Sequence, residues 1–468
     1  MTEYKNYQSP LSWRYGSDEM RQIWSEYTKR LLWRETWVAV AQAQAELGLV
    51  SQDQVEELRT HAKDIDIDRS LAIENEIHHD VMAEVRTFAE QAPAAGGILH
   101  LGMTSMDVVD NTDALRVQRS LNLILQRLDR ILEHLADQIE RWAETPVMAF
   151  THLQPAEPST LGYRMACYGQ DLLIDRENLM HRRSNLRGKG FKGAVGTSAT
   201  FAELMGEENL PRFERRLSDI LGIPFFPLAS QVYPRKQDYD ILSALAGLGA
   251  SLHKLAFDLR FLQSPPIGEM SEPFAAQQVG SSAMPFKRNP ILAEKIDSLA
   301  RLLAQYPRVA WDNAALSLLE RTLDDSANRR TILPESFLIT DELLRTGERI
   351  ISAWVVHETA ISKNLDQYGP FAATEAVLMA LSKAGADRQA MHERLRGHAL
   401  KAWAHVMQGR ENPLQEYVEK DEVFLQYRSR TELRNDMQAR ARFGLAAERA
   451  LGMAQTIRQT ISKGGSQR

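Results

Sequence analysis

Apolar residues recur at steps of three and four through three long stretches of the chain. These stretches are residues 121–142, 238–259 and 296–303. The spacing puts the apolar side chains on one face of an amphipathic α-helix. Because such faces must be buried against one another, we predict an all-α fold around a bundle of long helices. The same faces can also pack across subunits, so the pattern is compatible with an oligomeric bundle core.

The pattern differs on either side of this central region. The apolar segments before residue 105 are shorter, and from about residue 357 they are short again. In the last part we expect breaks at Gly369–Pro370, Gly385 and Asn412–Pro413. We therefore predict three helical domains, at residues 1–105, 106–356 and 357–468. This number agrees with a chain of 468 residues at roughly 150 residues per domain.

The composition is that of an ordinary globular protein. Hydrophobic residues make up 44% of the chain and charged residues 25%, and the net charge of -6 gives no support for binding nucleic acid. No apolar run is long enough to cross a membrane, and the first residues contain no secretory signal. The one cysteine, Cys167, excludes an intrachain disulfide, and its apolar helical context predicts a small core residue. These features favour a cytoplasmic protein.

Residues 280–290 read Gly-Ser-Ser-Ala-Met-Pro-Phe-Lys-Arg-Asn-Pro and are predicted to form a loop ahead of a helix. Hydroxyl groups and cations lie together there, and this combination suits a site that removes a proton and holds the anion left behind. Ser281 becomes a usable base only if cations or backbone N–H groups stabilise its alkoxide. Lys287 and the N-terminus of the next helix can supply both. From composition alone, a polar surface loop is the simpler interpretation.

Three shorter segments also carry polar groups suited to binding or proton transfer. His152 lies between a threonine and a glutamine and suits proton transfer near neutral pH, although without a partner a surface histidine is the simpler interpretation. The segment His78-His79-Asp80 lacks the spacing that places metal ligands on one helix face, so we predict no metal site. The pair Thr104-Ser105 can cap a helix or offer hydroxyl groups to a carboxylate.

Basic residues are concentrated in two segments. Residues 181–193 are basic and rich in glycine but lack the Gly-Lys-Ser/Thr ending of a Walker loop, so we interpret them mainly as a solvated connection between helices. Residues 320–330 contain three arginines and a serine, which can hold phosphate or carboxylate groups. The alternative is that these arginines pair with Asp324 and Asp325 of the same segment.

The loop at residues 280–290 closely resembles the signature loop of the fumarase/aspartase superfamily, whose members release fumarate from succinyl-type substrates. Its Lys-Arg-Asn-Pro ending is similar to the adenylosuccinate lyase and carboxymuconate cycloisomerase branches. The other fragments occur in the order seen in the adenylosuccinate lyase family, and they look closest to its animal-type branch. These fragments are Arg14-Tyr15, His79-Asp80, Thr104-Ser105, Thr151-His152-x-Gln154-Pro155, Gln231 and Glu320–Arg330.

The resemblance implies a fold of three helical domains whose central helices associate into a homotetramer, with active sites built from more than one subunit. It implies β-elimination of fumarate from adenylosuccinate, which gives AMP. It also implies the same reaction on the succinyl-carboxamide ribotide SAICAR, which gives AICAR, so both reactions belong to purine nucleotide biosynthesis. No metal or organic cofactor is implied.

The resemblance also implies a role for each matching residue. Ser281 would remove the proton from the succinyl carbon, and His152 would protonate the leaving nitrogen. Glu294 would orient His152, while Lys287 and Asn289 would stabilise the carbanion. The residues expected near the nucleotide phosphate are Arg14, Tyr15, Arg321, Ser326 and Arg330. Those expected near the base, the ribose and the succinyl carboxylates are His79, Asp80, Thr104, Ser105 and Gln231.

Three positions depart from the family pattern. Phe286 stands where relatives often have histidine or tyrosine, and His78 where close relatives carry arginine. Lys295 stands where animal-type members have arginine, and it keeps the charge but loses the bidentate geometry. We still place His78 and Lys295 among the substrate-binding candidates, because these changes bear on affinity more than on the reaction.

Two other interpretations stay open. The first is another fumarate-releasing lyase, of the argininosuccinate lyase or carboxymuconate cycloisomerase type. The arginines of residues 320–330 and Arg14 instead favour a phosphorylated substrate. The second is a non-catalytic helical scaffold, because a fold does not determine a function. The presence of Ser281, His152 and Lys287 argues against that scaffold.

Overall fold

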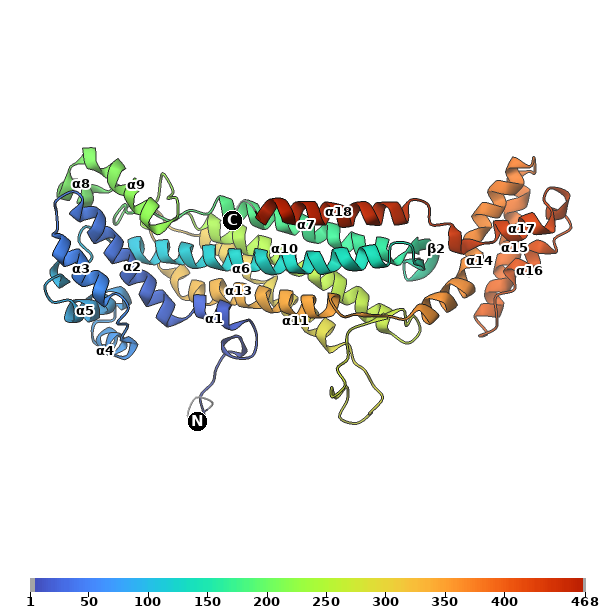
Figure 1. The fold of residues 1–468 in the computed structure, drawn as a ribbon, viewed down its shortest axis with the longest axis horizontal. Helices are drawn as coiled ribbons and strands as arrows, with labels where there is room; N and C mark the ends of the chain where they lie inside the picture. The colour runs from blue at the N-terminus through green and yellow to red at the C-terminus, as the bar shows by residue number, and fades with distance from the viewer. Residues whose placement is uncertain (1–4, 466–468) are drawn as a thin grey trace. The chain divides into compact units, whose positions relative to one another are not determined.

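The computed structural model describes residues 5–465 and is mostly helical (Figure 1). The chain divides into two compact units. Unit 1 comprises residues 1–128, 175–250 and 298–345, and unit 2 comprises residues 129–174, 251–297 and 346–468. The division into three domains stays a prediction.

Five long helices contribute residues to both units: α6 (Ser105–Arg141), α7 (Leu161–Ser184), α10 (Lys236–Gln263), α11 (Ile291–Leu303) and α13 (Asp324–Ile351). The other helices of unit 1 are α1 (Asp18–Ile23), α2 (Glu26–Ala45), α3 (Gln52–His61), α4 (Ile67–Ile77), α5 (Asp80–Gln91), α8 (Ala199–Met205), α9 (Leu210–Leu221) and α12 (Tyr306–Ala315). Those of unit 2 are α14 (Glu358–Lys383), α15 (Arg388–Val406), α16 (Leu414–Glu419), α17 (Arg430–Asp436) and α18 (Ala446–Gly465).

The three helices predicted from the apolar stripes are confirmed as α6, α10 and α11. Along α6 the stripe from Leu121 to Ile139 is buried, and its last predicted member, Trp142, directly follows the end of α6 and is partly exposed. However, α6 begins at Ser105, well before the stripe. Its first turns bury polar residues such as Asp107 and Asn111, which an apolar pattern does not detect.

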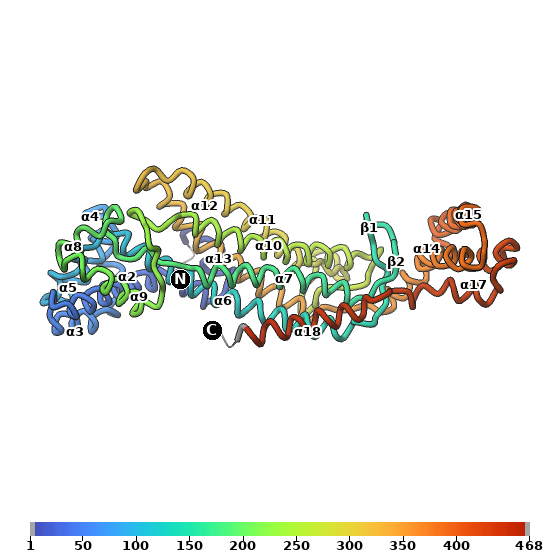
Figure 2. Tube along the Cα trace, turned by 90° about the horizontal axis from the view of Figure 1, so that it is seen from above, coloured from blue at the N-terminus to red at the C-terminus, as the bar shows by residue number. Residues whose placement is uncertain are grey.

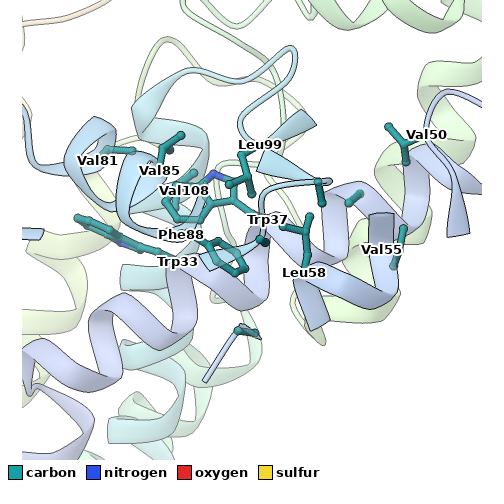
Figure 3. Close-up of a cluster of buried hydrophobic side chains, with 14 residues drawn as sticks. Trp33, Trp37, Val50, Val55, Leu58, Val81, Val85, Phe88, Leu99 and Val108 are labelled. Carbon is teal, nitrogen blue, oxygen red and sulfur yellow. The ribbon is translucent and has the colours of Figure 1, made fainter. Parts of the chain in front are cut away.

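Helices α2, α3 and α5 of unit 1 pack around a core of aromatic and aliphatic side chains. Figure 3 shows Trp33, Trp37 and Phe88 among the side chains of this cluster. Next to it, Glu84 accepts hydrogen bonds from the guanidinium groups of Arg30 at 2.9 Å and Arg34 at 2.7 Å, and all three side chains are buried. This ion-paired group joins α5 to α2. Helices α8 and α9 pack beside α2 (Figures 1 and 2).

Unit 2 contains two small antiparallel sheets. Strands β1 (Pro146–Thr151) and β2 (Gln154–Thr160) form a hairpin, and β3 (Met270–Ser271) pairs with β4 (Val355–Val356). Helices α14, α15, α16 and α17 pack against one another around a further hydrophobic core (Figure 1).

Two sequence-based predictions about unit 2 are wrong. The break expected at Gly369–Pro370 does not occur, because α14 continues through Pro370 as far as Lys383. Gly369 is buried, and a side chain there would press on Ala439. Glycine at this position therefore allows α14 to pack closely against Ala439. Cys167, expected in the core, is exposed on α7. Among the described helices, none combines the length and apolar character needed to cross a membrane.

Candidate active site

His152 lies at the tip of the β1–β2 hairpin, which the sequence did not predict. Thr151 pairs with Gln154, so His152 and Leu153 form a two-residue turn. Both have left-handed backbone conformations, with φ of 53° and 59°. A two-residue hairpin turn of this kind is normally made by asparagine and glycine, because other side chains are strained there. The imidazole is exposed and has no hydrogen bond or ion pair within residues 5–465.

Ser281 lies in an irregular segment between β3 and α11, as predicted for residues 280–290. Its Oγ accepts hydrogen bonds from the backbone N–H groups of Ala283 at 3.3 Å and Met284 at 3.1 Å. Two N–H dipoles that point at one oxygen favour negative charge on it. Cations and backbone N–H groups can both stabilise a serine alkoxide. The local backbone supplies the N–H groups.

The two ends of this loop are tied to each other. The side-chain amide of Asn289 donates to the carbonyl oxygen of Gly280 at 3.0 Å. A Cβ atom at Gly280 would collide with the carbonyl oxygen of Lys287, so a glycine is required at this close approach. Arg288 places its guanidinium 5.0 Å from the ring centre of Phe274. These contacts close a narrow loop with Ser281 inside it.

A buried carboxylate anchors the loop to α11. Glu272 accepts hydrogen bonds from the N–H groups of Leu292 and Ala293, at 2.9 and 3.0 Å, and so caps the start of that helix. Burial raises the pKa of Glu272, while these backbone N–H groups oppose that rise. Gln263 on α10 accepts from the N–H of Glu272 and donates to the carbonyl of Arg288. The sequence analysis missed Glu272, because a single carboxylate ahead of the loop does not by itself indicate a helix cap.

The remaining candidates of unit 2 lie on or beside this loop. The exposed carboxylate of Glu294, on the first turn of α11, is 3.9 Å from the guanidinium of Arg260. Lys295 follows it and is half-buried, whereas Lys287 is exposed. Among the described residues no hydrogen bond joins His152 to Glu294 or to Ser281. The orientation of His152 by Glu294 therefore stays a prediction.

In unit 1, the candidate residues that follow α4 lie next to the start of α6. The Nδ1 atom of His79 accepts from the N–H of Met82 and caps α5. The ring proton therefore lies on Nε2, which faces the Oγ of Ser105 at 3.4 Å. Thr104 precedes α6 directly, and its N–H donates to Asp107 at 2.9 Å. His78 ends α4 in a left-handed conformation and is exposed.

Asp80 connects this group to α13. Its Oδ2 accepts a hydrogen bond from the guanidinium of Arg330 at 2.9 Å, across 250 residues of sequence. Arg330 is 64% exposed, so its other N–H groups face solvent. Ser326 lies one turn earlier on α13 and is half-buried. The backbone N–H of Gln231 donates to the carbonyl oxygen of Glu320, at the start of the arginine-rich segment.

The three arginines of residues 320–330 have different surroundings. Arg321 donates to Asp325 at 2.7 Å, which is the pairing considered as an alternative for this segment, and Arg330 pairs with Asp80. Arg329 is buried and donates to Asp238 at 2.8 Å. Arg329 therefore faces the interior, whereas Arg330 is open to a ligand.

A buried ion-pair network joins residues 320–330 to other parts of unit 1. Arg235 donates to Asp325 at 2.6 Å and to Asp110 on α6 at 3.1 Å. The Tyr233 hydroxyl donates to Asp238 at 2.6 Å and accepts from Arg329 at 2.8 Å. Burial would raise the pKa of Asp325, but Arg235 and Arg321 lower it below its ordinary value. This network was invisible in the sequence because its partners are up to 125 residues apart.

The expectation of a solvated connection at residues 181–193 is wrong. Lys189 is completely buried, with its ammonium group against Asp107 and the carbonyl oxygen of Gly193. Asp107 also accepts from the N–H groups of Lys192 and Gly193, at 3.1 and 3.3 Å. A buried lysine requires such a counter-ion. The segment therefore holds Asp107, and through it Thr104, in place.

Arg14 and Tyr15 lie in a turn between Pro10–Ser12 and α1, as predicted. The Arg14 guanidinium is exposed, 5.7 Å from the ring centre of Trp13 and 5.9 Å from that of Tyr15. In the described part of the chain, no hydrogen bond or ion pair joins Arg14 to the pair Asp80 and Arg330. The turn instead packs on the second half of α13, through Gly16.

The comparisons with known proteins agree with this arrangement. The family profile described as "Lyase" matches residues 13–302, and the profile described as "Adenylosuccinate lyase C-terminus" matches residues 370–449. The adenylosuccinate lyase of Saccharomyces cerevisiae is 40% identical over 432 residues, which are 91% of this chain and 89% of the yeast protein. The adenylosuccinate lyase of Schistosoma mansoni is 38% identical over 431 residues, which are 91% of this chain and 89% of the Schistosoma protein.

The chain belongs to the adenylosuccinate lyase family. Among solved structures, the 3-carboxy-cis,cis-muconate lactonizing enzyme of Pseudomonas putida matches with a TM-score of 0.86. That match covers 96% of this chain and 100% of the other, at 24% identity. A likeness at this identity concerns the fold alone, and it confirms the predicted all-α class. The resemblance seen in residues 280–290 is thus confirmed at the level of the family.

Proposed function

We propose that the protein catalyses the β-elimination of fumarate from adenylosuccinate, which gives AMP, and from SAICAR, which gives AICAR. Membership of the adenylosuccinate lyase family supports the substrates. The single observation that supports the chemistry is the pair of backbone N–H groups directed at the Oγ of Ser281. This arrangement lowers the free energy of the alkoxide relative to the alcohol, so the serine becomes able to accept a proton.

In the proposed mechanism, the Ser281 alkoxide removes a proton from the succinyl carbon next to the one that carries nitrogen. The electron pair spreads into the adjacent carboxylate, and the cation of Lys287 with the amide of Asn289 stabilises that charge. The C–N bond then breaks, its electron pair goes to nitrogen, and His152 gives that nitrogen a proton. The products are fumarate and the free purine nucleotide or carboxamide ribotide.

Nucleotide binding is proposed for the candidates of unit 1. Arg330 offers N–H groups that Asp80 does not use, and Ser326 precedes it by one turn of α13. Together with Arg321 and the turn of Arg14 and Tyr15, these groups match the charge of a phosphate. His79, Thr104, Ser105 and Gln231 supply donors and acceptors for the remaining polar groups of the substrate. Arginine-rich recognition of phosphate favours these substrates over argininosuccinate.

We also propose that copies of the chain assemble into a homotetramer, with active sites that combine residues from different subunits. Two observations support this step. The imidazole of His152 is exposed and unpaired in the described residues. In addition, large apolar side chains on three of the long helices, such as Ile174, Phe257 and Leu302, are each more than 40% exposed, as expected for surfaces that another copy covers.

The first experiment measures fumarate release by the purified protein with adenylosuccinate, SAICAR and argininosuccinate in separate assays. We expect fumarate from the two purine substrates only. The Ser281→Ala variant should lower kcat by about a thousandfold or more, because the base is lost, while Ser282→Ala serves as the matched control. Fumarate from argininosuccinate alone would contradict the proposed purine substrates. Near-normal turnover by Ser281→Ala would contradict the assignment of Ser281 as the base.

A further inference from the structure

The backbone around Arg14 and Tyr15 is held by side chains that none of the assignments above includes. Gly16 has a φ of +78°, and a Cβ atom there would lie 3.0 Å from the side chain of Leu338 on α13. Its N–H donates to Glu342 at 3.1 Å, and its carbonyl oxygen accepts from Arg345 at 3.0 Å. Both polar groups of this one residue are therefore bonded to side chains of α13.

The neighbouring residues of the turn are held in the same way. The N–H of Ser17 donates to Asp341 at 2.6 Å, and Asp341 is fully buried beside Arg127. Arg21 donates to the carbonyl oxygens of Tyr15 at 2.9 Å and Gly16 at 2.7 Å. Side chains thus hold four backbone polar groups of this turn, which are the carbonyl of Tyr15, both groups of Gly16 and the N–H of Ser17.

These contacts fix the backbone but leave the functional side chain free. Arg14 is exposed and lines an open polar pocket of about 470 Å³ together with Arg21, Arg127 and Arg345. Arg345 is 44% exposed and also bonds to Glu342 at 3.2 Å, so Glu342 and Arg345 act on Gly16 as a pair. The rings near the Arg14 guanidinium, Trp13 and Tyr15, belong to the same turn, so the direction of Arg14 depends on the backbone of that turn.

We propose that Glu342 and Arg345 are positioning residues that orient the turn of Arg14 and Tyr15 and so set the affinity for the nucleotide. This inference rests on the proposed function, which gives Arg14 and Tyr15 a place at the phosphate. Helix α13 also carries Arg330, eight residues before Leu338, or about 12 Å along the helix axis. One rigid helix therefore sets the spacing between the two groups of phosphate-binding candidates.

The test uses the full-length protein and a double-mutant cycle between Arg345 and Arg14. We expect Arg345→Ala to raise KM for adenylosuccinate and Kd for AMP about three- to tenfold, the factor that one hydrogen bond contributes. The change in kcat should stay within about twofold, because no reacting group is touched. In the Arg14→Ala background, Arg345→Ala should add clearly less than it does alone, because its effect through Arg14 is already lost and only the effect through Tyr15 remains.

Two further variants separate positioning from general damage to the fold. Arg345→Lys can still donate to the Gly16 carbonyl and should restore part of the affinity. Arg308→Ala removes an exposed arginine of α12 that contacts Asp312 and the ring of Trp311 on its own helix, so it should leave KM and kcat unchanged. Size-exclusion chromatography and the midpoint of thermal unfolding check assembly and folding for each variant.

The outcomes distinguish this inference from the proposed function. If the wild-type protein releases fumarate and Arg14→Ala raises KM, but Arg345→Ala does not, only the positioning inference fails. Full additivity of the two substitutions would also overturn it, because Arg345 would then act independently of Arg14. If Arg14→Ala leaves both KM and the Kd for AMP unchanged, the role of Arg14 and the positioning inference fail together.

Discussion

At the scale of single residues, the turn of the β1–β2 hairpin concentrates unfavourable backbone conformations beside a candidate acid. His152 and Leu153 both have positive φ, and no glycine or asparagine relieves the strain. Strained backbone persists where the surrounding structure imposes it, and it occurs often at functional sites. The position of the His152 imidazole is therefore determined by the hairpin rather than by a side-chain partner.

Leu153 offers a direct test of this strain. Leu153→Gly should raise the free energy of unfolding by about 0.5–1 kcal/mol, because glycine adopts a positive φ without a steric cost. The measurement is the midpoint of thermal unfolding at fixed protein concentration. Thr151→Gly is the matched control, since Thr151 is in the extended conformation of β1. Glycine should destabilise the protein at that position, and stabilisation at both positions would contradict the argument.

The sequence was informative about individual residues only where the chemistry is local. The residues of 280–290 predicted a loop, and the structure places Ser281 in an irregular segment with two N–H groups directed at its Oγ, while its suitability for proton removal stays a prediction. Lys189 could not be interpreted in this way, because its counter-ion Asp107 lies 82 residues earlier. Cys167 was misplaced for a related reason, since an apolar neighbourhood in sequence does not determine which face of α7 a residue occupies.

At the scale of elements, helix α13 connects most of the candidate groups of unit 1. Its first turn holds Asp325, which bonds to Arg321 and to the buried Arg235. Its second turn carries Arg330, and its second half bonds to Gly16. A small change in the direction of this helix would thus move several of the candidate binding groups together.

The lowered pKa of Asp325 predicts a pH dependence of stability. Because the pKa in the folded protein lies below that of the unfolded chain, the ionised carboxylate stabilises the fold above about pH 4. That contribution is lost as the pH falls through the folded-state pKa. Asp325→Asn should therefore be clearly less stable at pH 7, and its deficit relative to the wild-type protein should shrink towards about pH 3.

Thermal unfolding midpoints between about pH 7 and pH 3 would measure this effect. Asp324→Asn is the matched control, because Asp324 is the neighbouring carboxylate on the same turn but is exposed. We expect its deficit to be small at every pH. A deficit of Asp325→Asn that does not change with pH would show that the loss arises from packing rather than from the ionised carboxylate.

The elements themselves were largely predictable, and the exceptions have physical causes. Apolar stripes revealed α6, α10 and α11, because long helices that bury one face must repeat their apolar residues. The start of α6 was missed since its buried face there is polar, as at Asp107. The hairpin was missed because His152-Leu153 is not a turn sequence, and α14 continues past Pro370 despite the lost backbone donor.

At the scale of the whole molecule, the proposed sharing of active sites can be tested without a new structure. His152→Ala and Ser281→Ala should each be inactive alone. If a site takes His152 from one subunit and Ser281 from another, mixing the two variants should restore activity. Random exchange in equal amounts should give about a quarter of the wild-type rate, because that share of sites contains both intact residues.

The control is a mixture of His152→Ala with a His152→Ala, Ser281→Ala double variant, which contains no intact histidine. It should stay inactive after the same dissociation and reassociation. Activity that fails to return in the first mixture, although exchange of subunits is demonstrated, would place both residues in one subunit and contradict the proposal.

The exposed position of Cys167 has a practical consequence for all of these experiments. The chain has one cysteine, exposed on α7, so the dissociated chain takes up a single maleimide dye before the subunits reassociate, without any engineered substitution. Every copy then carries the same fluorophore at the same place. Counting photobleaching steps on individual particles would report the number of copies directly, and dyes of two colours would follow the exchange of subunits in real time.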